Sequence, residues 1–414
     1  MAILNTDERG LWQHRSKRLL PSPGKVMIVM NILVLPDSFK ECLDAFAVAE
    51  AISRGLHHGA KEPPQILCRP MADGGEGLSR VILQARGGTT TALEVTGPMG
   101  PPVPSSLSLV EGGRTAVIEM AAAAGLVLVP LQERNPLKAT TRGVGELIRA
   151  ALDLGVRRII VGLGGSATND GGAGMAQALG ISLRDADGKE LAWGGGELER
   201  LHTIDLSRKD SRLSDVEIIG ACDVTNVLCG SGGASHVYGP QKGASPEVAE
   251  RLDQALHHFG SLVLAQTGKD VLTLSGGGAA GGLGAGLAAF ADAHLRPGIN
   301  LVFEAYGDME EQASKADLII SGEGSLDGQT LFGKVVAGVA LLAKRHEKPL
   351  VVLAGRIKGD LAPLYESGVT AVFPIAPEPM SPADAITSAS TYLEQSAENL
   401  ARFAECLLGS SANV

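Results

Sequence analysis

Short apolar runs that end in clusters of glycine are the feature of this sequence that most constrains its fold. Runs of Val, Ile and Leu repeatedly stop at a Gly-rich turn, and an Ala- and Leu-rich helical pattern follows, as at 158–162 and 172–179. This order of strand, loop and helix is typical of a mostly parallel, doubly wound sheet in an α/β fold. Strands are expected at 31–35, 66–70, 157–162, 216–221, 317–321, 349–354 and 370–374, and helices near 44–58, 77–86, 141–154, 246–266, 334–346 and 384–407.

The middle of the chain has a different pattern. Thr- and Val-rich runs between about 89 and 120 are separated by turn dipeptides at 97–98 and 112–113, and Asp187-Gly188 marks a further turn. Such spacing is typical of antiparallel hairpins. We therefore predict a discontinuous domain of βα units at 30–90 and 281–414, with a second α/β domain inserted at 91–280. Two domains also agree with a length of 414 residues, which exceeds what one hydrophobic core usually organises.

The N-terminal residues 1–29 are expected to be a disordered extension, with Met30 as the native start. Basic residues precede the apolar run at 26–30, but no small-residue cleavage site follows it, which disfavours a signal peptide. The run instead continues into the first expected strand.

Bulk charge and cysteine usage exclude several classes of protein. The chain has 36 Lys and Arg against 46 Asp and Glu, so nucleic acid is not an expected partner. Its five cysteines form no C-x-x-C pair, which disfavours a disulfide framework or zinc knuckle and favours the cytoplasm. No apolar run reaches the roughly 18 residues of a membrane span, so no membrane association is expected.

Polar loops follow the first two expected strands. Asp37, Ser38 and Lys40 come after the first strand, at the edge where open α/β sheets bind ligands, although Ser38 could instead cap the next helix. The second strand leads into 73–77, where Gly74 and Gly75 would let backbone amides approach an anion. The carboxylates of this loop suit a hard cation.

Two later loops carry further candidates. The Gly-rich loop 162–174 contains Ser166, Asn169 and Asp170 and could cradle phosphate through its amides, although it has neither a P-loop lysine nor dinucleotide spacing. Asp223 ends another strand, and Lys242 would come near it only if the intervening loop folds back. A buried, hydrogen-bonded Asp is the alternative for Asp223.

Two glycine motifs are weak matches to nucleotide-binding patterns. The G-x-G-x-x-G at 276–281 follows only a short apolar run, so close packing of a helix is the better interpretation. The G-x-x-x-x-G-K at 328–334 lacks the following Ser or Thr of a Walker loop. Glu323 and Asp327 could still hold a metal ion there, with Lys334 on a phosphate.

Taken in order, several motifs resemble the type I glycerate kinase family from about residue 31 to the C-terminus. These are PDSFK at 36–40, ADGGEG at 72–77, GGSATNDGG at 164–172, ACDVTN at 221–226, YGPQKG at 238–243, AAGGLG at 279–284 and GEG at 322–324. The resemblance implies a flavodoxin-like (Rossmann-type) domain with an inserted domain of restriction-endonuclease-like topology. It also implies that D-glycerate and ATP with Mg²⁺ meet in the cleft between the domains, giving 2-phosphoglycerate.

On this basis we assign roles to the loop residues as hypotheses. Catalytic roles go to Asp73, Asp223, Lys40 and Asp170, and which Asp acts as the base is left open. Binding of substrate or phosphate is assigned to Asp37, Ser38, Gly74, Gly75, Ser166, Asn169, Asn226, Lys242 and Lys334. Glu323 and Asp327 are the metal ligands. A homodimer is one option for the assembly.

The sequence departs from the family pattern at Cys42, Val227 and Ser325. Ser325 stands where the family commonly has an Arg, so Arg356, Lys334 or Lys40 would have to supply that cation. Two rival functions are an NAD-linked hydroxy-acid dehydrogenase and a non-enzymatic hydroxy-acid-binding protein. The first lacks a catalytic His neighbourhood, and the second predicts missing loop carboxylates or an attached DNA-binding module, neither of which is seen.

Overall fold

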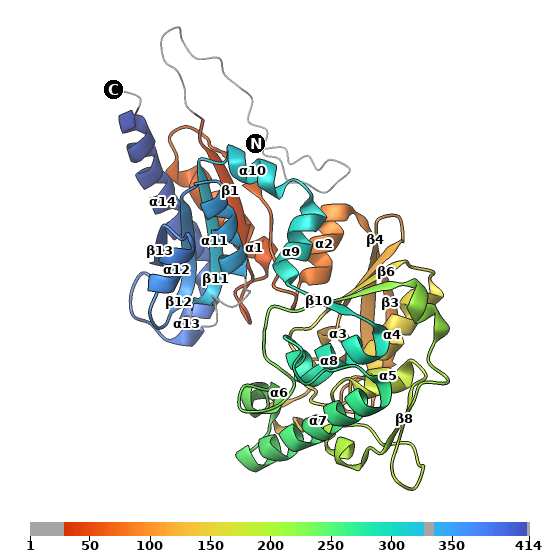
Figure 1. Ribbon diagram of the computed structural model, residues 1–414. Helices are drawn as coiled ribbons and strands as arrows, with labels where there is room; N and C mark the ends of the chain where they lie inside the picture. The colour runs from red at the N-terminus through yellow and green to blue at the C-terminus, as the bar shows by residue number, and fades with distance from the viewer. Residues whose placement is uncertain (1–28, 327–334, 412–414) are drawn as a thin grey trace. The chain divides into compact units, whose positions relative to one another are not determined.

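The computed structural model describes residues 29–326 and 335–411, so almost all of the predicted extension 1–29 lies outside the described residues. The chain divides into two units (Figure 1). The first contains residues 1–72 and 302–414, and the second contains residues 73–301. Each unit is α/β, as the glycine pattern predicted.

The first unit is built on a parallel sheet of five strands in the order β13-β12-β11-β1-β2. The strands are β1 (Asn31–Pro36), β2 (Gln65–Cys68), β11 (Leu318–Leu326), β12 (Leu350–Ile357) and β13 (Ala371–Pro374). Five consecutive residues of β1 are buried, which is why this strand is a continuous apolar run rather than an alternating one. In chain order the strands run 2-1-3-4-5, and the order reverses between β1 and β11.

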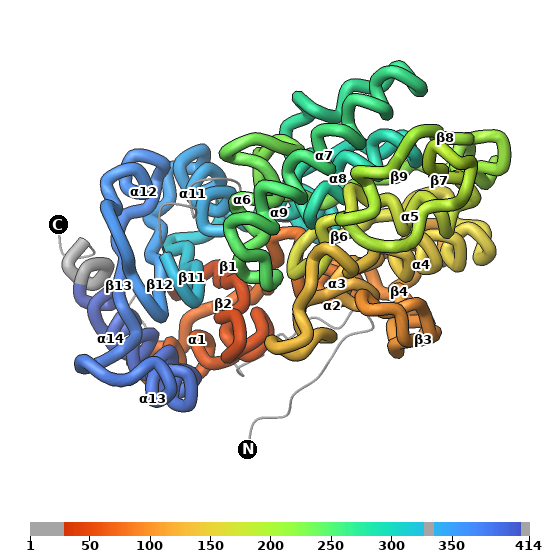
Figure 2. The backbone as a smooth tube through the Cα atoms, turned by 90° about the horizontal axis from the view of Figure 1, so that it is seen from below, coloured from red at the N-terminus to blue at the C-terminus, as the bar shows by residue number. Residues whose placement is uncertain are grey.

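Helices cover both faces of this sheet. Figure 2 shows α11 and α12 on one face and α1, α13 and α14 on the other. Their bounds are α1 (Ala45–Gly59), α10 (Met309–Lys315), α11 (Val335–Arg345), α12 (Ala362–Ser367), α13 (Pro382–Thr387) and α14 (Ala389–Ser411). Gly55 allows α1 and α14 to touch, because a Cβ at this position would collide with the carbonyl oxygen of Glu394 and lie 2.8 Å from Cβ of Ala397.

The second unit contains a mixed sheet of six strands in the order β10-β9-β6-β5-β4-β3. Its strands are β3 (Gly88–Thr96), β4 (Pro102–Val110), β5 (Thr115–Glu119), β6 (Arg158–Gly162), β9 (Glu217–Ala221) and β10 (His294–Arg296). The predicted hairpins are confirmed, because β3, β4 and β5 pair antiparallel through the two turn dipeptides, whereas β5, β6, β9 and β10 are parallel. The turn at Asp187-Gly188 is also confirmed by pairing of Arg184 with Glu190.

Helices and a small ribbon complete the second unit. The helices are α2 (Leu78–Arg86), α3 (Ala121–Ala124), α4 (Arg142–Asp153), α5 (Ala173–Ala178), α6 (Ala234–Tyr238), α7 (Pro246–Thr267), α8 (Ala279–Ala291) and α9 (Gly298–Tyr306), whose last residues belong to the first unit. Strands β7 (Ser182–Arg184) and β8 (Thr203–Asp205) form the ribbon. The 3₁₀ turns are η1 (Leu126–Leu128), η2 (Leu131–Glu133), η3 (Gly195–Arg200), η4 (Ser211–Asp215) and η5 (Pro240–Lys242).

The units divide at 72/73 and 301/302, whereas the sequence pattern placed the boundaries at 90/91 and 280/281. Helix α2 belongs to the second unit, where Oγ of Ser79 donates a hydrogen bond to Oγ of Ser108 in β4 at 2.8 Å. Strand β10 pairs with β9 in the same unit, and α8 packs in its core. These segments have the same alternation of strand and helix as the first unit. The change along the chain from βα units to hairpins therefore does not coincide with the boundary between the two units.

Among the described helices, none combines the length and the apolar character that crossing a membrane requires.

Candidate active site

The carboxyl ends of β1 and β11 place two buried carboxylic acids at the point where the strand order of the first unit reverses. The backbone N–H of Asp37 donates to the carbonyl oxygen of Gly322 at 2.9 Å, and Oδ1 of Asp37 accepts from the N–H of Ser38 at 2.7 Å. Asp37 and Glu323 are both buried, whereas Lys40 is exposed. Ligands of open α/β sheets bind at such reversal points.

The alternative that Ser38 caps the following helix is wrong. Asp44 is the N-cap of α1, because its Oδ1 accepts from the N–H of Ala47 at 2.8 Å. The loop that contains Ser38 is instead closed by paired backbone hydrogen bonds between Phe39 and Leu43. Ser38 therefore lies at the strand end and outside the helix cap, and its binding role stays a prediction.

The predicted metal ligands can be followed only in part. Asp327 and Lys334 lie outside the described residues. Within residues 29–326 and 335–411, no group of three or more His, Cys, Asp or Glu side chains is placed to hold a metal ion. Ser325 pairs in parallel register with Arg356 of β12, so one of the three candidate replacement cations is on the strand next to it.

In the second unit, the loop that follows β2 is held in a tight turn. Oδ1 of Asp73 accepts from the N–H of Gly75 at 3.0 Å, and Gly74 has a φ of 85°, a left-handed conformation that favours glycine. The loop also touches the end of β6, because a Cβ on Gly164 would collide with Cα of Gly75. Glycines at both positions thus bring two strand-end loops into contact.

Asp223 lies beside this turn. Its Oδ1 accepts from the N–H of Gly298 at 2.9 Å, and a Cβ on Gly74 would lie 3.2 Å from its Oδ2. Asp73 and Asp223 are both partly exposed and come from neighbouring loops. The two acids that the sequence singled out independently are therefore brought together.

The Gly-rich loop 162–174 is organised around Asp170. This carboxylate is fully buried and accepts from N and Oγ1 of Thr141 at 2.8 and 2.9 Å and from the N–H groups of Gly172 and Gly174 at 3.1 and 3.2 Å. Burial raises the pKa of Asp170, and the hydrogen bonds oppose that rise. Asp170 thus ties the loop to the start of α4, and its catalytic role stays a prediction.

Lys242, in the 3₁₀ turn η5, contacts the same loop, and its predicted approach to Asp223 stays a prediction. The residue is 1% exposed, and its ammonium donates to Oγ of Ser166 at 2.8 Å and to the carbonyl oxygen of Thr168 at 2.7 Å. Burial lowers the pKa of Lys242 to about 7, although the charge of Asp170 opposes the change. Lys242 therefore supports the loop from inside, and its role as a phosphate ligand stays a prediction.

The two predicted asparagines have hydrogen-bond partners that the sequence did not reveal. Nδ2 of Asn169 donates to Oγ of Ser235 in α6 at 2.9 Å. Nδ2 of Asn226 donates to the carbonyl oxygen of Gly232 at 2.7 Å, and its Oδ1 accepts from the hydroxyl of Tyr238 at 2.8 Å. Both side chains therefore connect a strand-end loop to α6.

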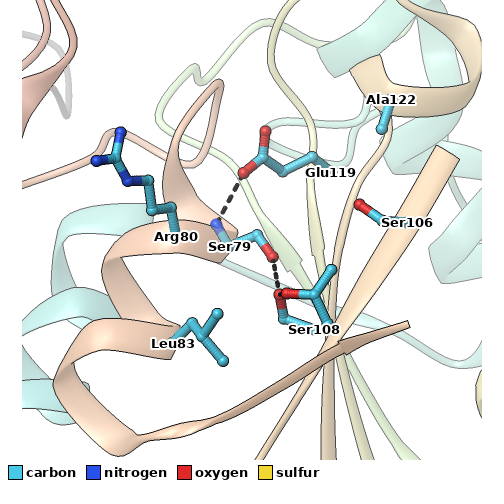
Figure 3. A pocket seen from close by; sticks show the side chains of 8 residues that line it. Ser79, Arg80, Leu83, Ser106, Ser108, Glu119 and Ala122 are labelled. Carbon is cyan, nitrogen blue, oxygen red and sulfur yellow. Dashed lines mark hydrogen bonds between the residues drawn. The ribbon is translucent and has the colours of Figure 1, made fainter. Parts of the chain in front are cut away.

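Glu119, at the end of β5, is a residue that the sequence analysis missed. Its carboxylate accepts from the N–H of Ser79 at 2.8 Å (Figure 3). It also accepts from the N–H of Gly77 at 3.3 Å, which anchors the far end of the 73–77 loop. Burial raises the pKa of Glu119. It lines a pocket of about 270 Å³ together with Ser79, Arg80, Leu83, Thr90, Ser106, Ser108 and Ala122. The sequence did contain one signal for Glu119, namely an acidic residue at the end of the apolar strand β5.

The G-x-G-x-x-G at 276–281 is a packing motif, as the sequence suggested. A Cβ on Gly281 would lie 2.7 Å from Cα of Asn169, and the N–H of Gly171 donates to the carbonyl oxygen of Gly281 at 3.0 Å. This glycine faces the 162–174 loop of the same unit. The dehydrogenase alternative thereby loses the feature that suggested it.

Carboxylates, a buried lysine and Gly-rich turns at the ends of parallel strands define an α/β protein of the class that binds polar small molecules at strand ends. Residues 32–405 match the model of the glycerate kinase family, and the chain belongs to this family. It is therefore a kinase enzyme.

Similar proteins cover most of the chain. It is 47% identical to a glycerate kinase of Bacillus subtilis (strain 168), over 90% of this chain and 97% of that protein. It is also 47% identical to the glycerate 2-kinase of Escherichia coli (strain K12), over 84% and 90% of the two chains. A crystal structure from Salmonella typhimurium LT2, of a protein whose proposed identity is glycerate kinase 2, is 48% identical with a TM-score of 0.78 and covers 94% of this chain and 100% of its own.

Proposed function

We propose that the chain transfers the γ-phosphoryl group of ATP to the 2-hydroxyl of D-glycerate, giving 2-phosphoglycerate and ADP. The observation that carries this proposal is the packing of the 73–75 turn beside Asp223, which puts two acids on contacting loops next to the Gly-rich loop 162–174. The name of the relative from Escherichia coli, glycerate 2-kinase, supports the 2-position.

The paired acids fit the metal that this reaction would use. Mg²⁺ in phosphotransferases is usually bound through one or two carboxylates, with substrate phosphates and water completing its shell. Asp73 and Asp223 would hold it, and the bound ion would neutralise charge on the transferring phosphoryl group. The roles of Glu323 and Asp327 as metal ligands stay predictions.

The same pair can take part in proton transfer. A carboxylate with one oxygen fixed by a backbone N–H is held in one orientation, as both Oδ1 atoms are here. One of the two acids would accept the proton of the substrate hydroxyl as the phosphoryl group arrives. Positioning and electrostatic stabilisation supply most of the catalysis in such transfers.

Phosphate contacts are assigned to backbone and exposed groups. The ammonium of Lys242 donates hydrogen bonds to Ser166 and Thr168. We therefore propose that Lys242 supports the 162–174 loop while the backbone amides of this loop face phosphate. Arg356, exposed and next to Ser325 in the sheet, and the exposed Lys40 are the candidate cations of the first unit.

We also propose the finer description of the fold that the sequence suggested. The strand order 2-1-3-4-5 of the first unit is the order of flavodoxin-like sheets. The restriction-endonuclease-like topology of the inserted unit, the cleft position of the active site, the cytoplasmic location and the homodimer stay predictions.

An ADP-release assay over a panel of C3 and C4 hydroxy acids tests the proposed activity. We expect D-glycerate to give the highest kcat/KM and reactions without a hydroxy acid to release only background ADP. A higher kcat/KM for another hydroxy acid would contradict the substrate assignment. Glycerate-dependent reduction of NAD without ADP release would favour the dehydrogenase alternative instead.

A further inference from the structure

Gly298 contacts both members of the acid pair in the second unit. It is the first residue of α9 and follows β10 closely. Its N–H donates to Oδ1 of Asp223 at 2.9 Å. A Cβ built on it would collide with the backbone N of Gly74 and would lie 2.6 Å from the carbonyl carbon of Asp73. No sequence motif considered above includes this residue.

The requirement for glycine at this position is one of space. Gly298 is not among the glycines of the described chain that have a positive φ, so an alanine could adopt its backbone conformation. Gly74, by contrast, needs both space and its φ of 85°. Substitution of Gly298 therefore tests the contact alone, without backbone strain.

We propose that Gly298 is a positioning residue that sets the spacing and orientation of Asp73 and Asp223. The Cα of Gly298 packs directly against the backbone of the Asp73 turn. Its N–H donates to the carboxylate of Asp223 and holds that side chain in place. This inference rests on the proposed role of the two acids in phosphoryl transfer. Gly298 itself would touch neither substrate nor metal.

The expected effect follows from the distances. Real Cβ atoms essentially never come within 3.0 Å of such backbone atoms, so the methyl group of Gly298→Ala must displace the 73–75 turn or α9. A displacement of about 1 Å at a reacting group costs roughly 100-fold in rate. We therefore expect kcat of Gly298→Ala to fall about 10- to 100-fold.

The full-length chain is tested in a double-mutant cycle with Asp223→Asn, using ADP release at saturating ATP and glycerate. If Gly298 acts through Asp223, the double variant should have the kcat of Asp223→Asn within about threefold, because the second change removes nothing further. Gly55→Ala is the matched control. A Cβ there collides with backbone in the first unit, so its urea midpoint should fall while its kcat stays within about twofold of wild type.

Asp223→Glu probes the same spacing without added bulk at Gly298. The longer side chain of Glu displaces the carboxylate while the backbone keeps its position. The kcat of Asp223→Glu should therefore fall to within about threefold of the kcat of Asp223→Asn. This variant decides the question if Gly298→Ala is recovered unfolded.

The outcomes separate the inference from the function on which it rests. Suppose that Asp223→Asn is impaired but Gly298→Ala or Asp223→Glu keeps a near-wild-type kcat. That result would overturn the inference about Gly298 and leave the proposed function standing. Losses that multiply in the double variant would also overturn it, because they would show an independent, structural role for Gly298. A near-wild-type Asp223→Asn would remove the proposed role of Asp223, and the inference with it.

Discussion

Replacement of Lys242 by Met should change how the stability of the protein depends on pH. The ammonium is buried against the 162–174 loop, where its hydrogen-bond acceptors are Oγ of Ser166 and the carbonyl oxygen of Thr168. The charged group whose field acts on it is Asp170. Met has a similar length and no titrating group, so the difference between the wild-type and variant free energies of unfolding reports the proton of Lys242 together with its coupling to Asp170.

The sign and size of the effect follow from the two pKa values of Lys242. Its pKa is about 7 in the folded chain against an ordinary value of 10.5, so between these values the unfolded chain binds more protons. Wild-type stability should therefore rise with pH through this window, whereas the cost of burying the charge is fully present below pH 7. Integration over the window from pH 7 to pH 9 gives a rise of about 2 kcal/mol from this group.

Urea unfolding of both proteins at pH 7, 8 and 9 measures the effect. Loss of the amine leaves two buried acceptors unsatisfied, at about 1–3 kcal/mol each. This cost changes the difference in free energy of unfolding between wild type and variant by the same amount at every pH. The wild-type advantage over Lys242→Met should thus grow by about 2 kcal/mol across the range. Lys315→Met, at an exposed helix position, should show no such growth. A difference between wild type and Lys242→Met that stays constant with pH would refute the reasoning.

Three further predictions concern the reaction and the chain ends. Excess chelator should abolish turnover, and full activity in chelator would contradict the metal assignment. Asp73→Asn and Asp223→Asn should each lower kcat more than about tenfold while their urea midpoints stay unchanged. A chain that begins at Met30 should keep wild-type kcat and solubility, because the family match spans 32–405; loss of either would show that residues 1–29 contribute. ATP, glycerate and enolase without phosphoglycerate mutase should yield phosphoenolpyruvate, since a cation on the carboxylate holds the 2-hydroxyl more tightly than the 3-hydroxyl. If the mutase is needed, the product is the 3-isomer.

The sequence alone was sufficient for many of the elements, although the helix expected at 384–407 is two helices, α13 and α14. The strand pattern at 31–35 and the helix pattern near 246–266 correspond to β1 and α7 within one residue at each end. Both are local signals, since a buried parallel strand must be apolar along its length and an amphipathic helix must repeat every 3.6 residues. Ordered motifs at the strand ends were likewise enough to indicate the glycerate kinase family.

Contacts between distant parts of the chain were decided only by the tertiary structure. Lys242 reaches Ser166 across 76 positions, and neither this contact nor the burial of Lys242 has a local signal in the sequence. The role of Gly298 depends on a loop more than 200 positions away, because no local pattern shows that a methyl group there would collide with Gly74. Side-chain type and periodicity are local properties of the sequence, whereas the distance between two loops depends on the tertiary fold. The 73–75 turn packs against the end of β9, which brings Asp73 near Asp223 and leaves no room for a side chain at position 298.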